Sequence, residues 1–262
     1  MKTISAKSVI ICLSIVFMCL IFTGQSTAKV DLTKAVAIWT FDEGSGNVVK
    51  DSSGNGSDGK FVKEPKWVNG KFGNALEFSG AGDYVDCGNA KSFDITDAIT
   101  IVAWINPADE AFTHQDFVGK PSAYILGHMD PPGPTLRSYI NNGGWFGADF
   151  SKPYKDYVGN WTHFAFTYDL SKLKIYVNGV VDKEVPVSGK ISVNANQVVI
   201  AHSCESQGFA AFFKGIIDEV AVFNIALSET DIKEIMNTSV SGKLAVSSSG
   251  KLATAWAIIK SQ

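Results

Sequence analysis

The feature that most constrains the fold is a pair of short segments in which apolar and polar residues alternate on either side of a turn signal. In segment 161–168, Phe164 and Phe166 share one face, because successive side chains of a β-strand point to opposite sides. Segment 173–177 repeats this alternation, and the Asn178 and Gly179 that follow favour the positive φ angles of a two-residue hairpin turn. The sequence therefore predicts an antiparallel hairpin with one buried face.

Short apolar or alternating segments of this kind recur along most of the chain, separated by glycine, asparagine and proline turns about every ten residues. We expect strands at 35–41, 73–78, 83–87, 99–106, 117–120, 123–129, 136–140, 145–150, 161–168, 173–177, 180–187, 198–204 and 215–223. This pattern is typical of an all-β sandwich or barrel and not of alternating β-α units. One short C-terminal helix is predicted at 228–237, where Ser228 begins a capping box and Ile232 and Ile235 form an apolar stripe.

The N-terminus has the pattern of a secretory signal peptide. Lys2 and Lys7 precede an apolar run at 9–22, and Ala28 closes a small-residue cleavage site. We therefore expect residues 1–28 to be removed, leaving a single domain at 29–237 and a tail at 238–262 with no transmembrane segment, in a secreted protein that is extracellular or periplasmic. The formal net charge of -3 and the lack of a basic patch give no reason to expect a nucleic-acid partner.

Two cysteines, Cys87 and Cys204, remain after the signal peptide. In an exported protein they would be able to form one disulfide. The alternative is two separate buried thiols, because the sequence does not show whether the two sulfur atoms meet.

Several motifs resemble the laminin G-like, concanavalin A-like modules of secreted proteins, and the resemblance spans 35–237. The matching segments are 39–46 (WTFDEGSG), 51–56 (DSSGNG), 75–78 (ALEF), 83–85 (DYV), 161–164 (WTHF), 174–179 (KIYVNG), 215–220 (GIIDEV) and 224–228 (NIALS), together with Trp67, Gly70 and Gly73. The resemblance implies a jelly-roll of two antiparallel sheets packed face to face, often with a bound calcium ion. It implies no single function, since this fold hosts lectins, adhesion modules and glycosidases.

A calcium site is predicted from the loop after the first strand. Asp51, Ser53 and Asn55 place oxygen-bearing side chains at the first, third and fifth positions of an EF-hand-like pattern, but the second half of that pattern is absent. The resemblance suggests that Asp42 and Asp218 complete a structural site that joins the two ends of the chain. The alternative is a plain turn, because Ser-Gly-Asn-Gly is also excellent turn sequence.

One motif raises the question of catalysis. Segment 229–234 matches the E-x-D-x-x-E signature of a concanavalin A-like glucanase family, whose mechanism needs two carboxyl groups flanking a sugar bond. On the predicted helix Glu229 and Asp231 would diverge, because residues two apart do not share a helix face. We therefore interpret the motif as a solvated helix face and expect no catalytic residues.

A cluster of aromatic and polar residues between positions 124 and 157 is the candidate for ligand binding. Its members are Tyr124, Tyr139, Trp145, Asp149, Tyr154 and Tyr157. Aromatic faces of this kind stack on sugar rings while neighbouring carboxylates bind hydroxyl groups, although such residues also fill sandwich cores. The sequence thus predicts a non-catalytic, calcium-associated adhesion module that binds glycans or extracellular proteins. The alternatives are a glycan-processing hydrolase of the same fold and a structural spacer of a cell-surface assembly.

Overall fold

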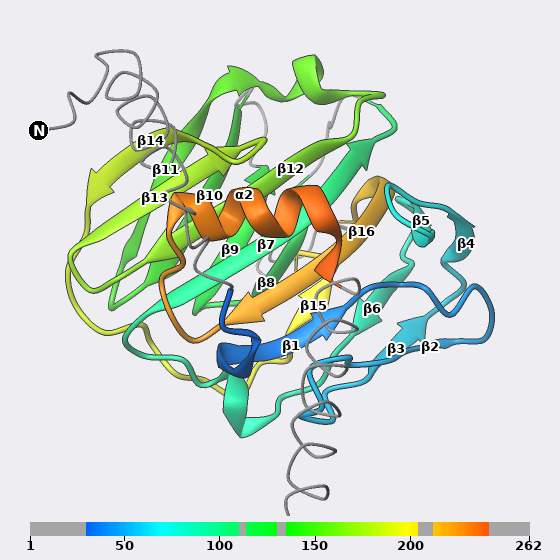
Figure 1. Ribbon diagram of the computed structural model, residues 1–262, viewed down its shortest axis with the longest axis horizontal. Helices are drawn as coiled ribbons and strands as arrows, with labels where there is room; N and C mark the ends of the chain where they lie inside the picture. The colour runs from blue at the N-terminus through cyan, green and yellow to red at the C-terminus, as the bar shows by residue number, and fades with distance from the viewer. Residues whose placement is uncertain (1–29, 110–113, 130–134, 204–211, 241–262) are drawn as a thin grey trace, which may run out of the picture.

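A computed structural model describes residues 30–109, 114–129, 135–203 and 212–240 of the chain. The fold is a sandwich of two antiparallel eight-stranded sheets (Figure 1). The first, sheet A, has the order β14 (Val180–Pro186), β13 (Lys172–Val177), β12 (Thr162–Tyr168), β7 (Ile99–Pro107), β16 (Lys214–Phe223), β5 (Asn74–Ser79) and β4 (Lys66–Asn69), with β1 (Ala35–Trp39) also paired to β16.

The second sheet, sheet B, lies behind sheet A in Figure 1. Its order is β11 (Trp145–Pro153), β10 (Thr135–Asn141), β9 (Tyr124–Met129), β8 (Val118–Lys120), β15 (Val199–Ile200), β6 (Tyr84–Asp86), β3 (Gly59–Val62) and β2 (Val48–Val49). Within the described ranges, the 3-10 turn η1 (Leu32–Lys34) precedes β1, and the turns η2 (Lys91–Phe93) and η3 (Tyr154–Tyr157) join strands.

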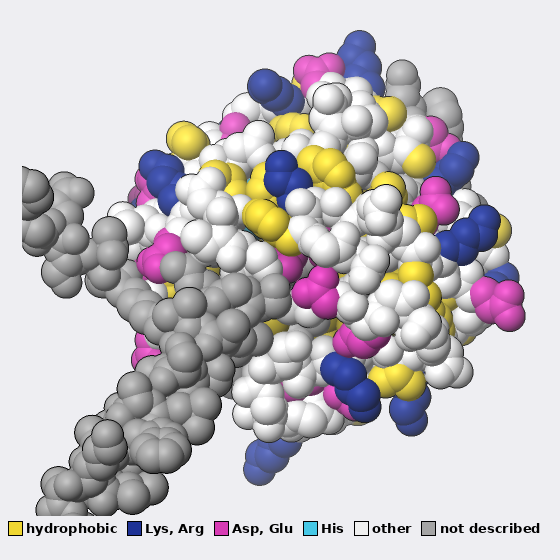
Figure 2. Space-filling view, turned by 45° about the vertical axis from the view of Figure 1, so that its right-hand side comes forward, with side chains coloured by type: hydrophobic (Ala, Val, Ile, Leu, Met, Phe, Trp, Pro, Cys, Tyr) yellow, Lys and Arg dark blue, Asp and Glu magenta, His cyan; other side chains and the backbone are white. Residues whose placement is uncertain are grey.

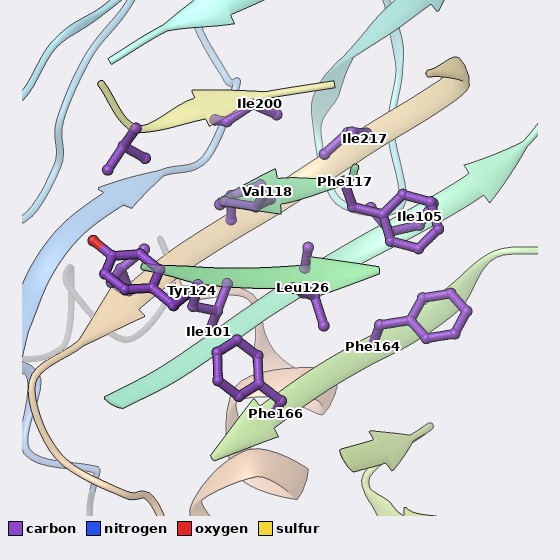
Figure 3. Close-up of a cluster of buried hydrophobic side chains, with 14 of the residues drawn as sticks. Ile101, Ile105, Phe117, Val118, Tyr124, Leu126, Phe164, Phe166, Ile200 and Ile217 are labelled. Atoms are coloured by element: carbon purple, nitrogen blue, oxygen red, sulfur yellow. The ribbon is translucent and has the colours of Figure 1, made fainter. Parts of the chain in front are cut away.

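The main hydrophobic core lies between the two sheets. Figure 3 shows Phe164 and Phe166 of sheet A facing Tyr124 and Leu126 of sheet B. All four side chains are completely buried. Burial of this kind is the dominant stabilising term in folding, and each large apolar side chain contributes about 1.5–3 kcal/mol. The predicted inward face of the segment 161–168 is therefore confirmed.

A second, smaller core lies on the outer face of sheet A, where helix α2 (Glu229–Thr238) crosses the strands (Figure 1). Ile232 and Ile235 of the helix are buried in this core with Val102 and Ala165 of the sheet. The capping box predicted at Ser228 is present, so the helix begins where the sequence indicated. Helix α2 therefore covers part of the outer face of sheet A.

Most of the predicted strands are present within one or two residues, and the hairpin turn has φ angles of 50° at Asn178 and 75° at Gly179. Two strands end earlier than expected because the backbone turns. Phe41 has a φ of 56° and Ala201 a φ of 71°, so β1 ends at Trp39 and β15 at Ile200. The short strands β2, β3 and β4 were not predicted.

The surface carries charges of both signs. Figure 2 shows one face, on which lysine, arginine and acidic side chains are interspersed and no continuous basic patch forms. Within the described ranges, no helix has the length and apolar character needed to cross a bilayer. The predicted signal peptide, most of the C-terminal tail and Cys204 lie outside the described residues.

Candidate functional site

Strands β10 and β11 present a small group of aromatic and charged side chains on the outer face of sheet B. The antiparallel register places Tyr139 opposite Gly147 and Arg137 opposite Asp149, with Trp145 at the start of β11. The neighbours of Tyr139 in the alternation, such as Ile140, belong to the core, so Arg137 and Tyr139 face away from it. We call Arg137, Tyr139, Trp145, Gly147 and Asp149 the β10–β11 notch.

The aromatic part of the notch is rigid. Trp145 is 48% exposed, and its ring meets the ring of Tyr139 edge-on, with 4.7 Å between the ring centroids. Tyr139 packs over Gly147, where an added Cβ would lie only 2.5 Å from the Cβ of Tyr139. The absence of a side chain at Gly147 therefore lets Tyr139 pack closely against β11. Tyr139 in turn contacts one side of the exposed Trp145 ring.

The charged part of the notch is an ion pair with two hydrogen bonds. Arg137 Nε donates to Asp149 Oδ1 at 2.7 Å, and the second contact, from Nη2 to Oδ2, is 3.1 Å long. This hydrogen bonding lowers the pKa of Asp149 below its usual value, so the carboxylate is ionised at neutral pH. Both side chains are about half exposed, and the pair is therefore accessible to a ligand.

His128 of β9 packs against the notch and is itself held by Asp116, which precedes β8. The His128 ring lies 5.2 Å from the Tyr139 ring, and its Nδ1 is 2.6 Å from Oδ1 of the buried Asp116. Arg137, His128 and Asp116 were not predicted from the sequence as site residues. Alternation along β10 was the signal that would have found Arg137, because it shares a face with Tyr139.

The structure separates the six predicted ligand-binding residues into two groups. Tyr139, Trp145 and Asp149 come together in the notch. Tyr124, Tyr154 and Tyr157 are buried in the main core, and Figure 3 shows Tyr124 among its apolar neighbours. The prediction that these three tyrosines line a binding surface is therefore wrong, and the core alternative holds for them.

The loop predicted to begin a calcium site is folded around its own aspartate. Asp51 Oδ1 accepts hydrogen bonds from the backbone amides of Ile38 and Ser53, and Oδ2 accepts one from Ser57, at 2.9–3.0 Å. Asn55 Nδ2 donates to the carbonyl oxygen of Val36 at 3.0 Å. These bonds fix the loop onto β1 and engage both carboxylate oxygens of Asp51. The hydrogen bonding is that of the plain turn and gives no support to Asp51, Ser53 and Asn55 as ligands.

Asp218 has a different environment. It is completely buried; its Oδ2 accepts a hydrogen bond from the Phe72 amide at 3.0 Å, while Oδ1 has no partner among the described residues. Burial raises the pKa of Asp218 to about 8, and burial likewise raises the pKa of the adjacent Glu219 to about 7. The two carboxylate oxygens of Glu219 accept hydrogen bonds from the Ser239 hydroxyl and the Val240 amide.

The carboxylates of Asp218 and Asp42 both lie against one tight loop, residues 70–73. A Cβ at Gly70 would lie 2.6 Å from Asp218 Oδ2, and a Cβ at Gly73 would lie 2.0 Å from Asp42 Oδ1. The loop 70–73 therefore needs glycine at both ends because both carboxylates press against it. In the described ranges, no three histidine, cysteine, aspartate or glutamate side chains are arranged to hold a metal ion. Asp42 and Asp218 alone, with one unpartnered oxygen, remain compatible with a cation that takes its other ligands from the backbone or water.

The E-x-D-x-x-E motif lies in the first turns of α2, as expected. Glu229 Oε1 is ion-paired with Lys233 at 2.6 Å, and Asp231 closes the capping box with Ser228. Both carboxylates stabilise the helix and are not directed at a shared site. Cys87 is buried and has no disulfide partner within the described ranges, and burial raises the pKa of its thiol well above its usual value.

Comparison with known proteins identifies the fold and family. The family model described as the concanavalin A-like lectin/glucanases superfamily matches residues 79–233. No curated protein sequence matches the chain. Among solved structures, domain 4 of AbnA, a GH43 extracellular arabinanase from Geobacillus stearothermophilus, in complex with arabinotriose, superposes with a TM-score of 0.62 at 20% identity. This match covers 78% of the present chain and 98% of that domain.

Toxin domains also share the fold. The binding domain of Paraclostridial Mosquitocidal Protein 1 has a TM-score of 0.63 at 15% identity, over 79% of this chain and 53% of that one. The receptor binding domain of botulinum neurotoxin C/D mosaic serotype has a TM-score of 0.61 at 13% identity, over 80% and 52%. The chain thus spans about half the length of these two toxin domains. At such identities the likeness shows the fold alone, but the family model covers more than half of the chain, and the protein therefore belongs to the concanavalin A-like lectin/glucanases superfamily.

Proposed function

We propose that this protein is a non-catalytic binding module that recognises glycans through the β10–β11 notch. The observation that carries the proposal is the exposed Trp145, held edge-on against Tyr139 beside the Arg137–Asp149 pair. An aromatic surface with a few positioned polar groups is the usual composition of a carbohydrate or small-ligand site. The aromatic ring covers the apolar side of a sugar, and the charged pair provides hydrogen-bond donors and acceptors for its hydroxyl groups.

The comparisons support a glycan as the class of ligand. Domain 4 of the arabinanase shares this fold and was solved in complex with arabinotriose. The toxin domains are named as binding or receptor binding domains, so an extracellular protein partner is the second candidate. The notch favours the glycan because its polar groups lie beside an aromatic platform and not within a broad apolar surface.

We also propose that the module binds a structural cation. Asp42 and Asp218 would hold it, because each carboxylate lies against one end of the loop 70–73 and one oxygen of Asp218 is buried without a described partner. A bound calcium ion would compensate these two acidic groups and fix the loop against β16. The role is structural, since the notch is built on β10 and β11 of the other sheet.

A glycan array, read with and without a chelator, tests the proposal. The Trp145→Ala variant should lose binding, because truncating an exposed aromatic anchor costs more than about 1 kcal/mol, or roughly a factor of five to ten in affinity. Phe146→Ala is the matched control. Phe146 is 46% exposed, yet it pairs with Ile140 and points to the other side of β11. Equal losses in both variants, or no binding by the unaltered protein, would contradict the proposal.

A further inference from the structure

We propose that the notch selects neutral glycans and that the Arg137–Asp149 pair is the specificity-determining element. This inference rests on the proposed function and adds the class of glycan to it. The two side chains place a guanidinium donor and a carboxylate acceptor next to each other, 2.7 and 3.1 Å apart, at the exposed edge of sheet B. Their chemistry matches two adjacent sugar hydroxyls, one donating to Asp149 and the other accepting from Arg137.

The charges around the notch are balanced. Arg137 is paired with Asp149, and on β9 the His128 ring is bonded to Asp116. On the neighbouring strand β14, Lys183 attracts Asp149, whereas Asp182 accepts a hydrogen bond from the Ser151 amide. Among the residues that the structure describes, the charges next to the notch therefore leave no excess positive charge for a uronate or sulfate group.

An acidic sugar would also have to displace an existing partner. Asp149 already occupies the fork of Arg137 with two hydrogen bonds, and its own charge would repel an incoming carboxylate at the same position. A hydroxyl group carries no such penalty, because it can accept from one member of the pair or donate to the other without breaking the pair. The pair thus favours neutral glycans by admitting hydroxyls and by excluding a competing anion.

The aromatic platform strengthens this selection. Trp145 lies four residues before Asp149 on β11, about 13 Å along the strand. Gly147 lies between them without a side chain, and the buried Tyr139 packs against it from β10. A ligand that contacts both ends therefore lies along β11, with a ring face on Trp145 and its hydroxyls at the ion pair.

Isothermal titration of the full chain with soluble arabinan and with polygalacturonate tests the inference. We expect the unaltered protein to bind arabinan at least about tenfold more tightly than polygalacturonate. Asp149→Asn should weaken arabinan binding by about tenfold, since it removes a charged acceptor, and should raise the affinity for polygalacturonate, because Arg137 is released. Arg137→Gln should weaken arabinan binding without any gain for polygalacturonate.

Asp109→Asn is the matched control. It neutralises the aspartate of an ion pair of similar exposure, Lys214–Asp109, whose lysine lies on β16 of sheet A, and it should leave both affinities unchanged. Thermal denaturation confirms that each variant is folded. A preference of the unaltered protein for polygalacturonate, or an Asp149→Asn variant with unchanged affinities, overturns the inference while glycan binding stands. The absence of binding to both polymers overturns the proposed function and the inference with it.

Discussion

Single carboxylates in this protein have distinct roles that depend on their immediate hydrogen-bond partners. Asp51 is surrounded by three backbone amides, whereas Asp218 is buried with one oxygen unpartnered among the described residues. Asp51 was predicted as a calcium ligand from the residue spacing in its glycine-rich loop, and Asp218 from the resemblance to the laminin G-like modules. The partners of Asp51 include Ile38, which lies thirteen residues earlier, and this contact is not visible in the local pattern.

Asp51→Ala should destabilise the protein by about 2–4 kcal/mol, because three amides lose a charged acceptor. The loss, measured by urea denaturation, should be the same with calcium and with a chelator. A loss that disappears once calcium is removed would show that Asp51 is a metal ligand after all.

His163 is the other residue whose environment leads to a prediction. It is almost fully buried on β12, its ring nitrogens have no described hydrogen-bond partner, and burial lowers its pKa to about 3. The unfolded chain takes up a proton near pH 6.5 while the folded chain does not. The His163 contribution to stability is therefore fully present above pH 6.5 and falls by about 1.4 kcal/mol per pH unit below it, until about pH 3.

The measurement is the free energy of unfolding as a function of pH, compared between the unaltered protein and His163→Phe. The variant should lose the part of the acid dependence between pH 6.5 and about 3 that His163 causes. Identical slopes in the two proteins would mean that His163 is protonated in the folded state.

At the level of elements, sequence patterns were sufficient where large apolar side chains alternate along a strand. The alternation in 161–168 and 173–177 predicted β12 and β13 closely, because their inward side chains enter one continuous core. Strands β2, β3 and β4 have two to four residues, most of them exposed or half-buried, so no apolar face marks them in the sequence.

The aromatic cluster shows the limit of such patterns. Tyr124 pairs with Ile140 and Tyr139 pairs with Ile125, so one tyrosine faces the core and the other faces out. Which strands are neighbours, and in which register, decides this difference, and a single sequence does not contain that information. The same reason explains why only half of the predicted binding residues lie in the notch.

Helix α2 covers sheet A and depends on its capping box. Ser228→Ala should lower the stability by about 1 kcal/mol, because the amide of Asp231 loses its acceptor at the helix N-terminus. Glu229→Gln, which affects only an exposed ion pair with Lys233, should change it by less than about 0.5 kcal/mol. Thermal denaturation distinguishes the two; equal effects would contradict the assigned role of the cap.

For the molecule as a whole, the proposed cation would connect the first strand region to β16 across the loop 70–73. A ligand present at a hundredfold excess over its Kd stabilises the folded state by about 2.7 kcal/mol, which corresponds to a shift of roughly 5–11 °C in Tm. We therefore expect chelation to lower the Tm and calcium to restore it, with Asp218→Asn abolishing the response. An unchanged melting curve after thorough chelation would contradict the cation proposal and leave glycan binding unaffected.

The central claim is that a glycan binds at the β10–β11 notch on sheet B. The most direct measurement is a titration of the isotope-labelled protein with arabinotriose, followed by NMR of the tryptophan Nε1–H and arginine Nε–H groups. The account predicts that the signals of Trp145 and Arg137 shift together and saturably, while that of Trp104 on sheet A stays in place. Shifts confined to residues of sheet A or α2, with Trp145 and Arg137 unchanged at saturation, would contradict it.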